Sequence, residues 1–161
     1  MKSYNVTSTI FEYESLKACP HDIQTLFTHA HNARLKAYAP YSNFLVGAAL
    51  LLENNTIVSG SNQENASYPS GLCAERTAIY YAGAQYPDII IKTIAICAGP
   101  SQQENTLPVP PCGACRQAIA EYEQNQKHPI EVYFMGTSGT VKMVRSLLEL
   151  LPLAFEKNFL S

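Results

Sequence analysis

Three cysteines and one glutamate have a spacing that suits metal-assisted catalysis. Cys112 and Cys115 stand three residues apart in the segment 111–115 (PCGAC), so on a helix both sulfur atoms lie on one face. Cys73 and Glu75 lie two residues apart in a second motif, 73–76 (CAER). Thiolates are good metal ligands, and a nearby carboxylate can move protons. The two motifs together predict a metal centre with a catalytic acid beside it.

Both motifs are predicted to begin helices. Pro111 suits a first helical turn, where its missing N–H costs nothing, and Ser70 and Gly71 precede Cys73 as a plausible start. Cys73 and Glu75 would lie roughly 200° apart around a helix interior, so they converge only if Cys73 is at the helix start. The free N–H groups and the positive dipole end found there favour a thiolate over a thiol.

Three thiolates leave zinc one ligand short of a tetrahedron. Structural zinc sites have four protein ligands, whereas catalytic sites keep the fourth position for water. Cys97 is a candidate fourth ligand, but its apolar strand context favours core packing, and the histidines at 21, 29 and 31 lie on a predicted surface helix. An open, catalytic site is therefore favoured. The alternative is a non-catalytic binding module that a closed zinc site holds together.

Charged neighbours suggest further roles at such a centre. Glu75 could take a proton from a zinc-bound water and return it to a substrate, or it could be an exposed carboxylate that the helix dipole stabilises. Zinc with three thiolates carries one excess negative charge. Arg76, on the same helix face as Cys73, could donate hydrogen bonds to the sulfurs, and Arg116 could do the same; the alternative for either arginine is a surface cation.

The hydrophobic pattern predicts alternating helices and strands, which is typical of a layered α/β domain. Helical periodicity spans 21–39, 73–85 and 112–125, and a short apolar helix is expected within 146–160. Strands are predicted at 44–52, 57–58, 89–98, 130–135 and 140–144.

Composition restricts the partners that the chain is expected to have. The 161 residues are 47% hydrophobic and 15% charged, which indicates one ordinary globular domain. The basic residues are scattered and the net charge is −2, so we expect no nucleic-acid partner. No apolar run is close to the length of about 20 residues that a membrane-spanning helix needs. The first 20 residues resemble no export or organelle signal, and five cysteines argue against a disulfide framework, so a cytoplasmic location is predicted.

Beyond the two motifs, three further segments carry a family resemblance: 41–49 (YSNFLVGAA), 60–68 (GSNQENASY) and 151–155 (LPLAF). With them the chain resembles the small, homotetrameric, zinc-dependent cytidine deaminases over roughly 37–155. The resemblance implies a three-layer α-β-α fold with a central mixed five-stranded sheet. It divides the chain into an N-terminal extension, 1–20, and a single zinc deaminase domain, 21–161.

The resemblance also implies an activity. Cys73, Cys112 and Cys115 would bind one Zn²⁺ per subunit, and an activated water would attack C4 of cytosine while Glu75 protonates N3. Cytidine and deoxycytidine would become uridine and deoxyuridine with release of ammonia, as in pyrimidine salvage. The three-cysteine ligand set departs from a histidine-containing deaminase signature and agrees with the tetrameric branch.

Six residues are implied to contact substrate: Phe44, Asn62, Glu64, Tyr68, Ala74 and Phe155. Phe44 would lie against the nucleoside, and Asn62 and Glu64 would hydrogen-bond the ribose 3′-hydroxyl. Phe155 would stack on the pyrimidine in a neighbouring subunit's site, and Tyr68 would reach across a subunit interface. Without the resemblance, these aromatic residues would be interpreted as packing residues, and Asn62 and Glu64 as solvated turn residues.

Two other enzymes remain possible at this point. A related aminohydrolase acting on a modified cytosine nucleoside, such as a blasticidin S deaminase, would share the chemistry, although Glu64 and Phe155 favour the ordinary nucleoside. A polynucleotide-editing deaminase is disfavoured by the scattered basic residues.

Overall fold

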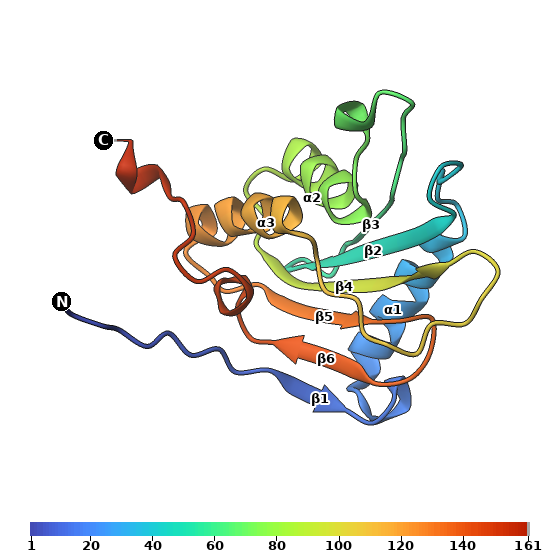
Figure 1. The fold of residues 1–161 in the computed structure, drawn as a ribbon, viewed down its shortest axis with the longest axis horizontal. Helices are drawn as coiled ribbons and strands as arrows, with labels where there is room; N and C mark the ends of the chain where they lie inside the picture. Colours follow the sequence, from blue (N-terminus) through green and yellow to red (C-terminus); the bar gives the residue numbers. More distant parts are fainter. Residues whose placement is uncertain (161) are drawn as a thin grey trace.

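The computed structural model describes residues 1–160 (Figure 1). Its helices and strands, in chain order, are β1 (Phe11–Tyr13), α1 (His21–Arg34), β2 (Phe44–Leu52), β3 (Ile57–Ser61), α2 (Ala74–Gln85), β4 (Ile91–Pro100), α3 (Gly113–Gln126), β5 (Glu131–Met135) and β6 (Val141–Val144). Short 3₁₀ turns lie at Leu16–Ala18, Tyr68–Ser70, Leu147–Leu150 and Lys157–Phe159.

One mixed sheet, with strand order β1-β6-β5-β4-β2-β3, forms the centre of the molecule. Strands β4 and β5 are parallel, and all other neighbours are antiparallel. The predicted α/β class and mixed sheet are confirmed, but the sheet has six strands where five were expected. The additional strand is β1, which has only three residues and no fully buried position. So short a strand gives no readable hydrophobic alternation.

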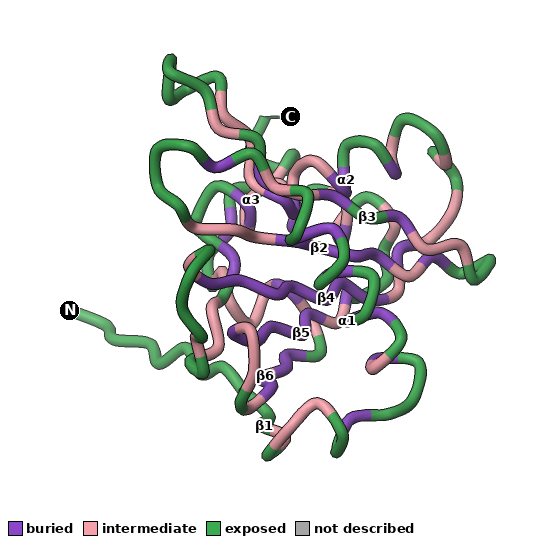
Figure 2. Tube along the Cα trace, turned by 90° about the vertical axis from the view of Figure 1, so that its right-hand side faces the viewer, coloured by how far each residue is buried: buried purple, intermediate pink, exposed green. Residues whose placement is uncertain are grey.

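Two hydrophobic clusters, one on each face of the sheet, confirm the three-layer arrangement. Consecutive residues of a strand point to opposite faces. Accordingly, Leu50 joins the cluster of α2 and α3, whereas its neighbour Ala49 joins the cluster of α1. Figure 2 shows the buried residues concentrated along the inner strands, with exposed loops and termini around them. Helix α1 therefore covers one face of the sheet, and α2 and α3 cover the other.

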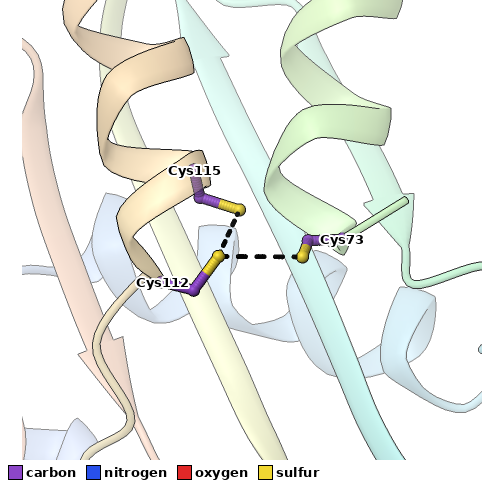
Figure 3. Close-up of side chains that lie close together, drawn as sticks. All are labelled: Cys73, Cys112 and Cys115. Carbon is purple, nitrogen blue, oxygen red and sulfur yellow. Dashed lines mark hydrogen bonds between the residues drawn. The ribbon is translucent and has the colours of Figure 1, made fainter. Parts of the chain in front are cut away.

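Strand direction explains why the two cysteine motifs meet. Strands β3 and β4 are both antiparallel to β2, so they run in the same direction. Each is followed by a helix on the same face of the sheet, α2 after β3 and α3 after β4. Both helices therefore begin near the same end of the sheet, and their N-termini lie side by side (Figures 1 and 3).

The predicted helix boundaries are correct to within two residues except at two places. The first helix ends at Arg34 instead of continuing to residue 39, and the backbone then turns toward β2. The C-terminal segment forms two short 3₁₀ turns, Leu147–Leu150 and Lys157–Phe159, instead of one helix.

Segment 9–19 adds to the sheet and the core. Strand β1 pairs with β6, and the Glu12 carboxylate lies 3.7 Å from the Lys142 ammonium. The guanidinium of Arg145 lies 4.9 Å from the ring centroid of Phe11. Cys19, at the end of this segment, is buried in the cluster of α1.

Gly60 on β3 allows α2 to pack closely at the end that carries the first cysteine motif. A Cβ atom at this position would lie 2.7 Å from the carbonyl oxygen of Ala74 and 2.6 Å from the backbone nitrogen of Ala78. These are backbone atoms, so no side-chain rotation relieves the overlap. The glycine thus fixes the distance between β3 and the first turns of α2.

Gly60→Ala is expected to lower the free energy of unfolding by about 1–3 kcal/mol, because α2 must move away from β3. The same movement displaces Cys73, so zinc content should fall as well. Thermal denaturation and metal analysis of the purified variant measure both effects. Gly113→Ala is the matched control, because nothing lies within 4 Å of its added Cβ atom. Equal stability of the two variants would contradict the packing argument.

Candidate active site

The sulfur atoms of Cys73, Cys112 and Cys115 converge between the starts of α2 and α3 (Figure 3). The Cys73 and Cys112 sulfurs are 3.9 Å apart, and those of Cys112 and Cys115 are 3.5 Å apart. Cys73 caps α2 and Cys112 caps α3, and each carbonyl oxygen accepts the first hydrogen bond of its helix. Both N-terminal helix dipoles therefore favour negative charge at the sulfurs.

The sulfur positions fit a zinc ion. With Zn–S bonds of about 2.3 Å and tetrahedral angles, ligand sulfurs lie about 3.8 Å apart. All three sulfurs lie within 4.8 Å of one another, so only small rotations are needed to reach that spacing. Three soft thiolate donors are a ligand set that selects zinc over harder cations such as magnesium.

The candidates for a fourth protein ligand lie on the other face of the sheet. Cys97 belongs to the buried cluster under α1, and its thiol donates to the carbonyl oxygen of Gly136 at 3.2 Å. The histidines at 21, 29 and 31 are all on α1. Within residues 1–160, no other group of three potential metal-ligating side chains is close enough to hold an ion. Neither Cys97 nor these histidines can therefore supply a fourth ligand to a zinc ion that the three cysteines bind.

Arg76 lies within hydrogen-bond distance of a cysteine sulfur. Its guanidinium Nη2 donates to the Cys73 sulfur at 3.5 Å. Hydrogen bonds from Cys115 and Arg76 lower the pKa of Cys73 to about 5. The pKa of Cys115 is raised, because its thiol proton is shared with the Cys73 thiolate. Cys73 is therefore already ionised at neutral pH, and zinc binding has to displace the proton that Cys115 shares with it.

Arg116 donates to backbone carbonyl groups, and not to a cysteine sulfur as was suggested for it. Its guanidinium donates to the carbonyl oxygens of Pro111 and Leu150, each at 2.8 Å. It therefore joins the loop immediately before Cys112 to the C-terminal segment. The sequence could not indicate this role, because Leu150 is distant along the chain.

Glu75 is buried at the start of α2, with 4% of its surface exposed. The alternative of an exposed helix-start carboxylate is therefore excluded. Burial raises the pKa of Glu75, and the negative charge of Cys73 raises it further. A carboxyl group with a raised pKa can both accept and donate a proton near neutral pH.

A cleft of about 370 Å³ opens beside Cys73 and Arg76. Its walls include three of the predicted substrate contacts, Asn62, Glu64 and Tyr68. The cleft therefore brings Cys73 of the cysteine cluster together with three of the residues that were predicted to contact substrate. Tyr41, Ser42, Gln63, Asn65, Gly71 and Leu72 complete the lining.

Asn62 has a structural role at the edge of this cleft. Its Nδ2 donates to the carbonyl oxygen of Phe44 at 2.9 Å, and its Oδ1 accepts from the backbone N–H of Val46 at 2.8 Å. The oxygen and the nitrogen of the Asn62 side-chain amide are therefore both hydrogen-bonded to the backbone at the start of β2. Phe44 is held against Asn62 in this way but is not part of the cleft lining.

Two other predicted contacts, Phe155 and Ala74, are also not part of the cleft lining. The ring of Phe155 is 58% exposed and stacks on Phe159, with ring centroids 5.9 Å apart. Gln117 of α3 donates to the backbone carbonyl of Phe155 at 2.9 Å and so fixes this part of the C-terminal segment. Ala74 is completely buried at the first position of α2.

The sequence did not single out Tyr41 and Ser42, which hold one of the residues predicted to contact substrate. Their backbone N–H groups donate to Glu64 Oε2 at 2.9 and 3.2 Å, and the Ser42 hydroxyl donates to Glu64 Oε1 at 2.5 Å. The Ser42 hydrogen bond, followed by those of the two backbone N–H groups, lowers the pKa of Glu64. Both residues stand in one of the segments that carry the family resemblance, but their contact with Glu64 joins positions more than 20 residues apart.

The layered fold with its cysteine centre defines a zinc-dependent deaminase. A sequence model of the cytidine and deoxycytidylate deaminase zinc-binding region matches residues 20–128. The chain therefore belongs to the cytidine and deoxycytidylate deaminase family.

Named relatives agree with this assignment. A cytidine deaminase from Sporosarcina psychrophila is 41% identical over 140 residues, which are 87% of this chain and 96% of that protein. One from Halalkalibacterium halodurans is 42% identical over 134 residues, 83% of this chain and 94% of that protein. The crystal structure of a cytidine deaminase from Burkholderia pseudomallei has a TM-score of 0.72 at 42% identity, and the match covers 85% of this chain and 100% of that chain.

Over residues 1–160, no helix has the length and apolar character needed to cross a membrane.

Cysteine substitutions distinguish a zinc centre with three cysteine ligands from one in which Cys97 is the fourth ligand. Cys97→Ala should retain one zinc per subunit, because its thiol lies across the sheet from the other sulfurs. Cys112→Ala should lose most of the zinc, because two sulfurs remain. Metal analysis after dialysis against a weak chelator measures both contents. Loss of zinc from Cys97→Ala with a native circular dichroism spectrum would contradict the assignment of three ligands.

Proposed function

We propose that this protein is a zinc-dependent hydrolase that deaminates cytidine and deoxycytidine to uridine and deoxyuridine, releasing ammonia. The observation that carries the proposal is the arrangement of three convergent sulfurs, a buried glutamate and an adjoining cleft. The family assignment and the activity named for the relatives support the same conclusion.

Cys73, Cys112 and Cys115 would hold the metal through their sulfur atoms. Bound zinc supplies Lewis-acid activation of a water molecule in its open position. Arg76 and the starts of α2 and α3 offset the excess negative charge of three thiolates, which would otherwise weaken the metal as a Lewis acid.

Glu75 is proposed as the proton carrier. It takes a proton from the attacking water, delivers it to N3 of cytosine, and so makes C4 a better electrophile. The raised pKa supports this role, because a carboxylate with an ordinary pKa holds a proton poorly at neutral pH. Burial also keeps Glu75 from exchanging its proton freely with bulk water.

The far side of the cleft is proposed to bind the sugar through Asn62 and Glu64. Glu64 has a lowered pKa and is ionised at neutral pH. A carboxylate accepts a hydrogen bond from a ribose 3′-hydroxyl and repels a phosphate group. Free nucleosides, rather than nucleotides or polynucleotides, are therefore the proposed substrates.

The expected role of Glu75 is tested by Glu75→Gln. This variant should keep its zinc, because Glu75 is not a ligand, and should lose about 10²–10⁴-fold in kcat for lack of a proton carrier. Loss of cytidine absorbance measures turnover, and metal analysis on the same sample measures zinc. Undiminished turnover would exclude Glu75 as the proton carrier.

We propose further that the active form is a homotetramer in which neighbouring subunits complete each site. The exposure of Phe155, and of Tyr68 at 74%, supports this assembly, because large exposed aromatic rings on fixed segments commonly mark interfaces. Tyr68 also packs against Tyr41, with ring centroids 5.9 Å apart. In the tetramer Phe155 would stack on the pyrimidine bound by a neighbour.

A mixing experiment tests the contribution of Phe155 in trans. Phe155→Ala and Glu75→Gln should each be nearly inactive toward cytidine as homotetramers. Mixed tetramers, formed by co-expression, should recover activity, because some sites combine Glu75 from one subunit with Phe155 from the next. Activity that never exceeds the sum of the two parents would contradict the shared site. Phe159→Ala, at the ring that stacks on Phe155, is a control for loss of local packing.

A cytoplasmic location and a role in pyrimidine salvage complete the proposal. The five cysteines are all free, and three converging thiols need a reducing environment to stay available for metal. The reaction converts a cytosine nucleoside to a uracil nucleoside, which is a salvage step.

A further inference from the structure

The carboxylate of Glu64 is held by donors from one short loop. Both of its oxygens are used: Oε2 accepts the N–H groups of Tyr41 and Ser42, and Oε1 accepts the Ser42 hydroxyl at 2.5 Å. The two backbone donors fix only one oxygen. The Ser42 hydroxyl is therefore the group that fixes the rotation of the carboxylate about its last bond.

The direction of the Ser42 hydrogen bond is determined by a second contact. The backbone N–H of Phe44 donates to Ser42 Oγ at 3.0 Å, so this oxygen acts as an acceptor on that side. Its single proton then goes to Glu64, which as a carboxylate can only accept. Hydrogen bonds to ionised groups are shorter and stronger than neutral ones.

The loop that carries Ser42 has a fixed backbone. Asn43 has a left-handed φ of 54°, and its N–H donates to the carbonyl oxygen of Ala39 at 3.0 Å. The carbonyl oxygen of Asn43 accepts from the N–H of Ser101 at 2.8 Å. The loop is therefore attached both to the segment after α1 and to the segment after β4. A hydroxyl on this loop can impose an orientation on Glu64 rather than follow it.

Ser42 also connects the proposed sugar-binding residues. It contacts Phe44 and Glu64 directly, and Phe44 is in turn bound by Asn62. Glu64 already accepts three hydrogen bonds, and a carboxylate has about four acceptor positions. One position is left for a ligand in the cleft, and the rotation that Ser42 imposes determines where that position lies.

On the basis of the proposed function, we infer that Ser42 is a positioning residue that sets specificity for the sugar. It holds Glu64 so that the remaining acceptor position meets the 3′-hydroxyl of a bound nucleoside. Ser42 acts through Glu64 and does not itself contact the reacting atoms. The preference for nucleosides with this hydroxyl over those without it should therefore depend on Ser42.

The test compares cytidine with 3′-deoxycytidine as substrates of the zinc-loaded enzyme. Ser42→Ala should raise KM for cytidine about tenfold, the effect of one charge-assisted hydrogen bond, and leave kcat within about twofold. KM for 3′-deoxycytidine should change little. The ratio of the two kcat/KM values should fall about tenfold, and Ser42→Thr, which keeps the hydroxyl, should restore it. Ser59→Ala, at an exposed serine of β3, is the matched control and should leave the ratio unchanged.

The outcomes distinguish this inference from the proposed function. Equal losses for the two substrates in Ser42→Ala, accompanied by a lower melting temperature, would show a structural role only and overturn the inference. An unchanged ratio, or failure of Ser42→Thr to restore it, would also overturn it while the deaminase activity stands. A wild-type protein that carries zinc but does not deaminate cytidine would overturn the proposed function, and the inference with it.

Discussion

The site depends on one constraint, the approach of two helix starts to a single point. Three sulfur atoms within 4.8 Å would repel one another as thiolates if nothing opposed their charge. The N-terminal dipoles of α2 and α3 and the guanidinium of Arg76 supply that opposition. Because β3 and β4 run in the same direction, the sheet brings both helix starts to the same end. The topology thus creates the electrostatic setting before any metal is bound.

Two glutamates of this region have pKa values that are shifted in opposite directions. Burial raises the pKa of Glu75, as the proposed role in proton transfer requires. Hydrogen bonds lower the pKa of Glu64, so this carboxylate stays charged, as the proposed contact with a sugar hydroxyl requires. The two glutamates have the same side chain and opposite shifts. Their surroundings, and not their chemical type, determine the different roles that are proposed for them.

Local spacing predicted that Cys112 and Cys115 share a helix face and that Cys73 stands at a helix start, whereas the approach of the two helices depends on the directions of β3 and β4. It also predicted Arg76, which is on the same helix face as Cys73. The roles of Arg116 and Ser42 depend on contacts with Leu150 and Glu64, which are distant along the chain. Asparagine tolerates the left-handed conformation that Asn43 adopts, but the residue type does not show that the turn brings Ser42 to Glu64. What the sequence did not reveal was therefore mostly long-range hydrogen bonding.

The short strand β1 has a consequence for the behaviour of the molecule in a crowded solution. Without it, β6 would present a row of unpaired backbone groups to any extended chain nearby. With it, the edge strand of the sheet is three residues long and carries the charge of Glu12 at its middle. A short, charged edge strand is a poor template for pairing with a further strand. The N-terminal segment therefore leaves few unpaired backbone groups on that side for another chain to bind.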